Sequence, residues 1–161
     1  QYTQDEFTPI RVAQKENTTT SLYYQKGELI ENWLEVAPIY PPHRNLCRGL
    51  CGDVVYEQLS LLNPGEEYID GALMSASSKL SVAESFSKAE ADERSALVII
   101  RGGVPCCSSI RGASALPDEY EVLISKRAVF EVISKEERKL HKDDKDETLV
   151  LVVKYKRKTD E

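Results

Sequence analysis

The stretch Pro117-Asp118-Glu119-Tyr120-Glu121-Val122-Leu123-Ile124 sets two acidic residues at the start of an apolar run. Such a run indicates a buried strand, and side chains two positions apart on a strand share one face. Glu119 and Glu121 are therefore predicted to point into one cleft, while Val122 and Ile124 face the core. Solvated carboxylates at an exposed strand end are the simpler interpretation, and other parts of the chain must decide between the two.

Two upstream stretches favour a site. Leu46-Cys47-Arg48-Gly49-Leu50 places an arginine in a short apolar strand, where a guanidinium needs an anionic partner because burying an unpaired charge is costly. A structural ion pair with an acid of the same domain would also satisfy Arg48. Gly71-Ala72-Leu73-Met74-Ser75-Ala76-Ser77 ends a strand with two serines that share one face, and Ala83 and Phe86 follow at helical spacing. An arginine, a serine pair and a glutamate pair thus follow one another on three predicted strands.

This ordered set resembles the arginine-serine-glutamate class of mono-ADP-ribosyltransferases, over roughly residues 44–133. The resemblance extends to Glu121-Val122-Leu123-Ile124 followed by Phe130-Glu131-Val132, as in the E-V-L-(L/I)…F-x-V run of that family. Each motif alone is weak evidence, whereas the complete set in this order is fairly specific.

Length and composition indicate one soluble domain. The 161 residues are 41% hydrophobic and 30% charged, and no apolar run approaches the ~20 residues that span a bilayer. With 21 basic against 27 acidic residues, the net charge of −6 disfavours nucleic acid and anionic membranes as partners. Three residues separate Cys47 from Cys51, and Cys106 and Cys107 are adjacent, so the spacing matches no zinc finger and we expect no metal site.

The order of the predicted elements indicates an α+β domain. Residues 1–20 are polar and are predicted to form an arm or linker, and residues 21–161 a single catalytic domain. Helices are predicted over residues 22–37, 54–62 and 81–94, and strands over 45–51, 68–77, 97–100, 120–124, 128–133 and 148–155. Trp33 is predicted to anchor the first helix in the core, and residues 135–147 to form a solvated hairpin excursion. Helices followed by strands favour a two-sheet, mainly antiparallel β core.

The resemblance implies a role for each site residue. In that family NAD lies in a cleft between two small sheets, and Arg48 would bind its phosphate and ribose portion. The backbone of Gly49 would meet the nicotinamide amide, since a missing side chain lets a flat ligand approach. Ser75 would hold the catalytic glutamate, Glu121, by a hydrogen bond. Ser77 joins the same set of NAD-binding positions.

The chemistry of the reaction explains the paired acids. Cleavage of the bond from ribose to nicotinamide creates an oxocarbenium-like cation, which a fixed carboxylate at Glu121 stabilises. An acceptor arginine has a pKa above ~12 and is a poor nucleophile until it is oriented and deprotonated, and Glu119 is placed for that task. In the family, a glutamate at this position goes with arginine acceptors. Phe86 is predicted to pack in the core, with flanking of the nicotinamide as the alternative.

We therefore expect an NAD-dependent mono-ADP-ribosyltransferase that transfers ADP-ribose from NAD to an arginine of a target protein and releases nicotinamide. Similarity to bacterial toxins and effectors further implies a secreted monomer that acts in the host cytoplasm. Two alternatives stay open. One is an NAD glycohydrolase that passes the ribosyl cation to water, and the other is an inactive ADP-ribosyltransferase-like module that binds a protein partner.

Overall fold

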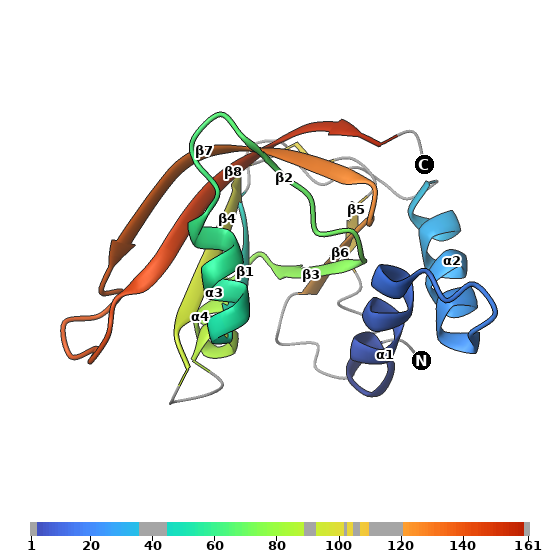
Figure 1. Ribbon diagram of the computed structural model, residues 1–161, viewed down its shortest axis with the longest axis horizontal. Coiled ribbons are helices and arrows are strands. Elements are labelled where there is room, and N and C mark those ends of the chain that lie inside the picture. The colour runs from blue at the N-terminus through green and yellow to red at the C-terminus, as the bar shows by residue number, and fades with distance from the viewer. Residues whose placement is uncertain are drawn as a thin grey trace.

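The computed structural model describes residues 3–35, 45–88, 93–101, 103–104, 107–109 and 121–159 (Figure 1). The helices in these ranges are α1 (Thr3–Glu16), α2 (Leu22–Glu35), α3 (Asp53–Ser60) and α4 (Leu80–Ser87). The strands are β1 (Leu46–Cys51), β2 (Glu67–Tyr68), β3 (Met74–Ser77), β4 (Ser95–Arg101), β5 (Cys107–Ser109), β6 (Glu121–Ile124), β7 (Ala128–Arg138) and β8 (Thr148–Lys158).

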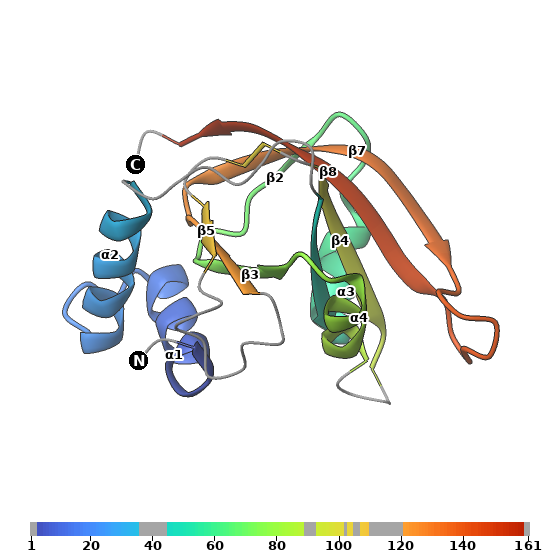
Figure 2. The ribbon, with the colours of Figure 1, turned by 180° about the vertical axis from the view of Figure 1, so that it is seen from behind.

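The strands form one curled sheet in the order β2-β7-β8-β4-β1-β3-β6-β5 (Figures 1 and 2). Neighbouring strands run antiparallel except for β4 and β8, which are parallel. The predicted α+β class with a mainly antiparallel core is therefore confirmed. The prediction of two sheets is wrong, because β1 and β3 pair at Cys47 opposite Ser77 and so join the two halves into one sheet.

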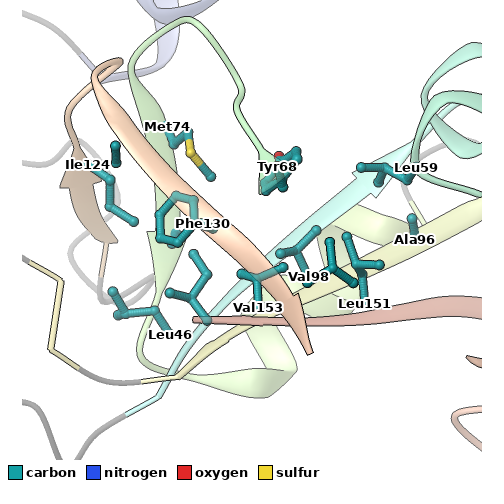
Figure 3. Packing of buried hydrophobic residues seen from close by; sticks show 14 of the residues in the cluster. Leu46, Leu59, Tyr68, Met74, Ala96, Val98, Ile124, Phe130, Leu151 and Val153 are labelled. Carbon is teal, nitrogen blue, oxygen red and sulfur yellow. The ribbon is translucent and has the colours of Figure 1, made fainter. Parts of the chain in front are cut away.

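The main core is a cluster of buried apolar side chains, part of which Figure 3 shows. Alternate residues of neighbouring strands face it, as the period of two along a strand requires. Phe130 is fully buried at its centre, with ring centroids 6.1 Å from Tyr68 and 6.2 Å from Tyr155. Tyr56 and Leu59 of α3 close the core over β1 and β4, against Leu46, Ala96, Val98 and Ile100.

The outer face of the sheet is covered by helices at two separate places. Ala83 of α4 packs against Cys47 of β1 and Leu97 of β4. On the other half, α1 and α2 pack against the segment around β3 and β6, through the buried residues Ile10, Leu34, Leu73 and Leu123. Figures 1 and 2 show α1 and α2 at one end of the molecule, and α3 and α4 beside β1 and β4.

The N-terminal segment differs from the predicted polar arm. Residues 3–16 form α1, in which Ile10 and Ala13 are buried, so this segment is a packed helix. In α2 the predicted core anchor is also wrong, because Trp33 is 46% exposed whereas the adjacent Leu34 is 1% exposed. The buried stripe of α2 runs through Gly27, Glu31 and Leu34 at helical spacing, and this stripe leaves Trp33 on the solvent side.

The excursion predicted over residues 135–147 begins later and is shorter in the structure. β7 continues to Arg138 and pairs there with Thr148, so residues 135–138 belong to a strand with mostly exposed side chains. At the hairpin tip, Leu140 packs against the α4 cluster. None of the helices in the described ranges is long and apolar enough to cross a membrane.

Candidate active site

Three adjacent strands bring the predicted site positions together. Arg48 lies on β1, Ser75 and Ser77 on β3, and Glu121 on β6, and these strands are neighbours in the order β1-β3-β6. The register sets Ser77 opposite Glu121 and Ser75 opposite Leu123. Positions that are 27 to 73 residues apart in the sequence therefore meet at one place in the sheet. Residue 119, the other predicted acid, lies outside the described ranges.

The two serines face away from the main core. Met74 and Ala76 belong to the core cluster, so the alternating residues Ser75 and Ser77 turn to the outer face of the sheet. This face carries α4 on the β1 side and the α1-α2 pair on the β6 side. Ser77 is buried, and its Oγ accepts a hydrogen bond from the Lys79 amide at 3.0 Å. The serine pair thus lies between the two helical covers.

Arg48 is buried and only partly satisfied. Its Nη1 donates to the carbonyl oxygen of Ser75 at 2.7 Å, and its Nη2 lies 3.8 Å from Oδ2 of Asp70. Within the described part of the chain, its Nε has no hydrogen-bond partner. The ion-pair interpretation is therefore correct in part, because Asp70 is an internal partner. The remaining N–H group is a donor that a bound anion could satisfy.

Asp70 and Arg11 are site residues that the sequence reasoning missed. Nη2 of Arg11, on α1, lies 2.9 Å from Oδ1 of Asp70 and donates a hydrogen bond to Oδ2 at 3.2 Å, and Nη2 of Arg48 lies 3.8 Å from the same Oδ2. Burial, and then repulsion from Arg48, lower the pKa of Arg11, while Asp70 raises it. A weak apolar spacing at Ile10 and Ala13 was the one sequence signal that α1 packs at all.

Gly49 has a packing role that the sequence reasoning did not predict. A β-carbon built on residue 49 would lie 1.7 Å from the carbonyl oxygen of Ala83 and 2.8 Å from the amide nitrogen of Ser87. The space that the missing side chain leaves is therefore filled by the backbone of α4. Close packing of this helix on β1 is what requires a glycine.

Phe86 is not a core residue, contrary to the packing prediction. It lies on α4 and is 49% exposed, whereas Ala83 on the same helix is 1% exposed. Helical spacing from Ala83 carries Phe86 to the edge of the buried stripe. Its accessible ring agrees with the alternative, in which Phe86 flanks a bound ligand.

The far end of β6 is held by α2. Glu31 is buried, and its carboxylate accepts hydrogen bonds from Ser125 Oγ at 2.6 Å and from the Lys126 amide at 2.8 Å. Burial raises the pKa of Glu31, and these two hydrogen bonds oppose that effect. The turn after β6 is thereby fixed to the helix, and with it the strand that carries Glu121.

Two thiols lie on β1, those of Cys47 and Cys51. Cys47 is buried beside α4, and burial raises the pKa of its thiol, which disfavours the reactive thiolate. Cys51 is the last residue of β1 and is half-buried. Among the residues that the structure describes, no three histidine, cysteine or acidic side chains are grouped so that they could hold a metal ion.

Known proteins resemble the chain in both sequence and fold. A family model described as NAD:arginine ADP-ribosyltransferase matches residues 37–151. No curated protein gives a significant match. The ADP-ribosyltransferase Vis, a toxin from Vibrio splendidus, is similar in its inhibitor complex, at 18% identity and a TM-score of 0.74, over 95% of this chain and 68% of that one. Vis has also been solved with agmatine.

Two further solved structures show the same fold. Exoenzyme S from Pseudomonas aeruginosa, solved with human 14-3-3 protein beta and carba-NAD, is 14% identical, with a TM-score of 0.72, over 93% of this chain and 67% of that one. An ADP-ribosyltransferase from Clostridium botulinum is 14% identical, with a TM-score of 0.61, over 91% of this chain and 80% of that one. The predicted ADP-ribosyltransferase fold is thus confirmed.

Proposed function

This chain belongs to the NAD:arginine ADP-ribosyltransferase family, and we propose that its catalytic centre lies where β1, β3 and β6 adjoin. The reaction of the family transfers ADP-ribose from NAD to arginine and releases nicotinamide. The observation that carries the proposal is the strand register, which sets Ser77 of β3 opposite Glu121 of β6. Arg48 donates a hydrogen bond to the backbone of β3, at the carbonyl of Ser75. NAD is the donor substrate.

Arg48 is proposed to bind the phosphate and ribose portion of NAD. Its buried guanidinium keeps an Nε–H with no partner among the described residues, and its distance of 3.8 Å from Asp70 leaves that ion pair loose. A planar fork with remaining donors suits a phosphate oxygen. The exposed ring of Phe86 is proposed to flank the nicotinamide, and the backbone of Gly49 to lie beside it.

Glu121 is proposed to stabilise the ribosyl cation. As the bond to nicotinamide breaks, positive charge develops on the ribose, and a fixed carboxylate at the 2′-hydroxyl lowers the energy of that state. Nicotinamide leaves as a neutral amide, so the step needs no strong general acid. The serine pair is proposed to hold Glu121 in place. Ser75 has the family role, and Ser77 is the direct cross-strand neighbour of Glu121.

Glu119 is proposed to orient and deprotonate the acceptor guanidinium. The agmatine complex of Vis supports this type of acceptor, because agmatine carries a guanidinium group. We further propose a target protein as the natural acceptor and a monomeric enzyme. The likeness to bacterial toxins supports a secreted effector that acts in the host cytoplasm.

The test separates cleavage of NAD from transfer to the acceptor. The protein is incubated with NAD and agmatine, and both nicotinamide release and ADP-ribosyl-agmatine are measured. Glu121→Gln should lower both by on the order of a hundredfold or more, because the amide keeps the shape but loses the charge. Glu119→Gln should retain substantial nicotinamide release yet lose transfer, because water needs less activation than a guanidinium. Glu136→Gln, an exposed change on β7, serves as the matched control.

Each other outcome contradicts a different part of the proposal. Near-normal turnover in Glu121→Gln would remove that residue from the catalytic centre. Equal loss of both products in Glu119→Gln would give that residue a role in cleavage or structure. Nicotinamide release without transfer in the wild type, unchanged by Glu119→Gln, would identify a glycohydrolase. NAD binding without turnover would identify an inactive binding module.

A further inference from the structure

Helix α1 holds Leu73, the residue before β3, by hydrogen bonds to both the amide and the carbonyl of that residue. Arg11 Nη1 donates to the carbonyl oxygen of Leu73 at 2.5 Å, and Gln14 Oε1 accepts from the amide of Leu73 at 2.8 Å. Leu73 is fully buried and directly precedes the strand that carries Ser75 and Ser77. Fixing both backbone groups of a buried residue fixes the start of the strand that follows. The N-terminal helix is therefore part of the frame of the proposed site.

Arg11 also shares a carboxylate with Arg48. Arg11 Nη2 lies 2.9 Å from Asp70 Oδ1, and Arg48 Nη2 lies 3.8 Å from Asp70 Oδ2; the three side chains are 16%, 7% and 8% exposed for Arg11, Arg48 and Asp70. Lys15 Nζ is also 3.8 Å from Oδ1, but its side chain is 50% exposed, so water screens its charge. Asp70 is paired mainly with Arg11 and only loosely with Arg48.

Among the residues that the structure describes, the buried guanidiniums of Arg11 and Arg48 both lie beside the one buried carboxylate of Asp70. The hydroxyl of Tyr68 is close enough to respond to these charges, but burial raises the pKa of Tyr68 to about 12, so this hydroxyl stays neutral. Among the described residues, Arg48 Nε lacks a hydrogen-bond partner. A buried guanidinium with an unsatisfied donor is costly until an anion completes its hydrogen bonds.

We propose that Arg11 is a positioning residue for Arg48: by pairing with Asp70, it keeps that carboxylate from capturing the Arg48 guanidinium, which stays open to the phosphates of NAD. The inference rests on the proposed function, because it takes NAD as the anion. Without the charge of Arg11, one buried carboxylate faces one buried guanidinium. Asp70 then competes with NAD for Arg48, and NAD binding weakens although no reacting group has changed.

A double-mutant cycle tests this competition. The Kd for NAD is measured by titration calorimetry for the wild type, Arg11→Gln, Asp70→Asn and the double variant. Arg11→Gln should raise the Kd on the order of tenfold. In the Asp70→Asn background the same change should alter the Kd less than about threefold, because no carboxylate remains to capture Arg48. In steady-state agmatine transfer, Arg11→Gln should raise the KM for NAD by a larger factor than it lowers kcat. Additive losses in the double variant, or an unchanged Kd in Arg11→Gln, would overturn the inference.

Two further variants separate charge from folding. Arg11→Lys keeps the positive charge and should bind NAD within about threefold of the wild type even where Arg11→Gln folds poorly; equal weakening by both changes would refute the charge argument. Arg127→Gln is the matched control, because Arg127 forms an ion pair with Glu35 of α2 at 3.1 Å, away from Arg48. Arg127→Gln should leave the Kd for NAD unchanged. A tenfold rise of the Kd in this variant too would mean that the weaker binding in Arg11→Gln comes from poorer helix docking.

The proposed function and this inference fail in different ways. If the folded wild type binds no NAD, both fail together. If the wild type binds NAD and Arg48→Lys weakens that binding while Arg11→Gln does not, only the role of Arg11 fails.

Discussion

Gly49→Ala is expected to lower the stability of the protein, because it forces α4 away from β1. The new β-carbon would lie 1.7 Å from the carbonyl oxygen of Ala83, whereas ordinary van der Waals contact begins near 3.4 Å, so the helix must move by about 1.7 Å. The obstructing atoms are backbone and cannot rotate away as a flexible side chain would. Overpacking of a core costs ~1–3 kcal/mol or more, and we expect about 3 kcal/mol here.

Urea unfolding measures this loss directly. The midpoint should fall while the slope stays unchanged, because the surface exposed on unfolding is nearly the same. Gly65→Ala is the control: a β-carbon there meets no atom within 4 Å, but φ is +92°, so this change adds only backbone strain of ~1–2 kcal/mol. Gly49→Ala should therefore lose clearly more stability than Gly65→Ala. Equal losses, or an unchanged midpoint, would refute the packing explanation of Gly49.

Three other changes test separate parts of the site. Arg48→Lys should raise the Kd for NAD roughly tenfold in calorimetry, since a point charge replaces a fork, and an unchanged Kd would return Arg48 to a structural ion pair. Phe86→Ala should weaken NAD binding yet leave the unfolding midpoint nearly unchanged, because the ring is 49% exposed; a large drop in stability with normal binding would contradict this. Glu31 has a folded pKa raised above its ordinary 4.5 by burial, so its contribution to stability is complete below pH 4.5 and declines as the pH rises through the folded value. Urea unfolding between about pH 4 and pH 8 should thus show a steeper decline in the wild type than in Glu31→Gln, and parallel curves would be the contrary result.

Much of the framework could be predicted from the sequence, because local patterns determine it. The apolar run at 122–124 and the continuous run at 97–100 are confirmed as buried strands, and β4 lies in the interior of the sheet as its fully apolar pattern required. The order of arginine, serine pair and glutamate also predicted that three strands would share one site, and they are neighbours in the sheet. The catalytic roles of these residues stay predictions.

The rest depended on contacts that no local pattern specifies. Asp70 and Arg11 are 59 positions apart, so no local spacing in the sequence predicts their ion pair. The need for glycine at 49 follows from how closely α4 approaches β1, which is a property of the packed helix. In α2, Trp33 and Leu34 are neighbours with large apolar side chains. Leu34 is the buried one, because the direction in which the whole helix docks places it against the sheet.

The position of β8 has a consequence for how the protein folds. It follows the other described strands in the sequence, yet it lies between β7 and β4 and supplies the fully buried residues Leu151 and Val153. Pairing β8 with β4 joins distant parts of the sequence in parallel, which is an intrinsically slow step. Until residues 148–158 are synthesised, β4 and β7 each keep an open edge that can pair with another chain. A chain cut before residue 148 should therefore aggregate, even though every proposed catalytic residue would still be present.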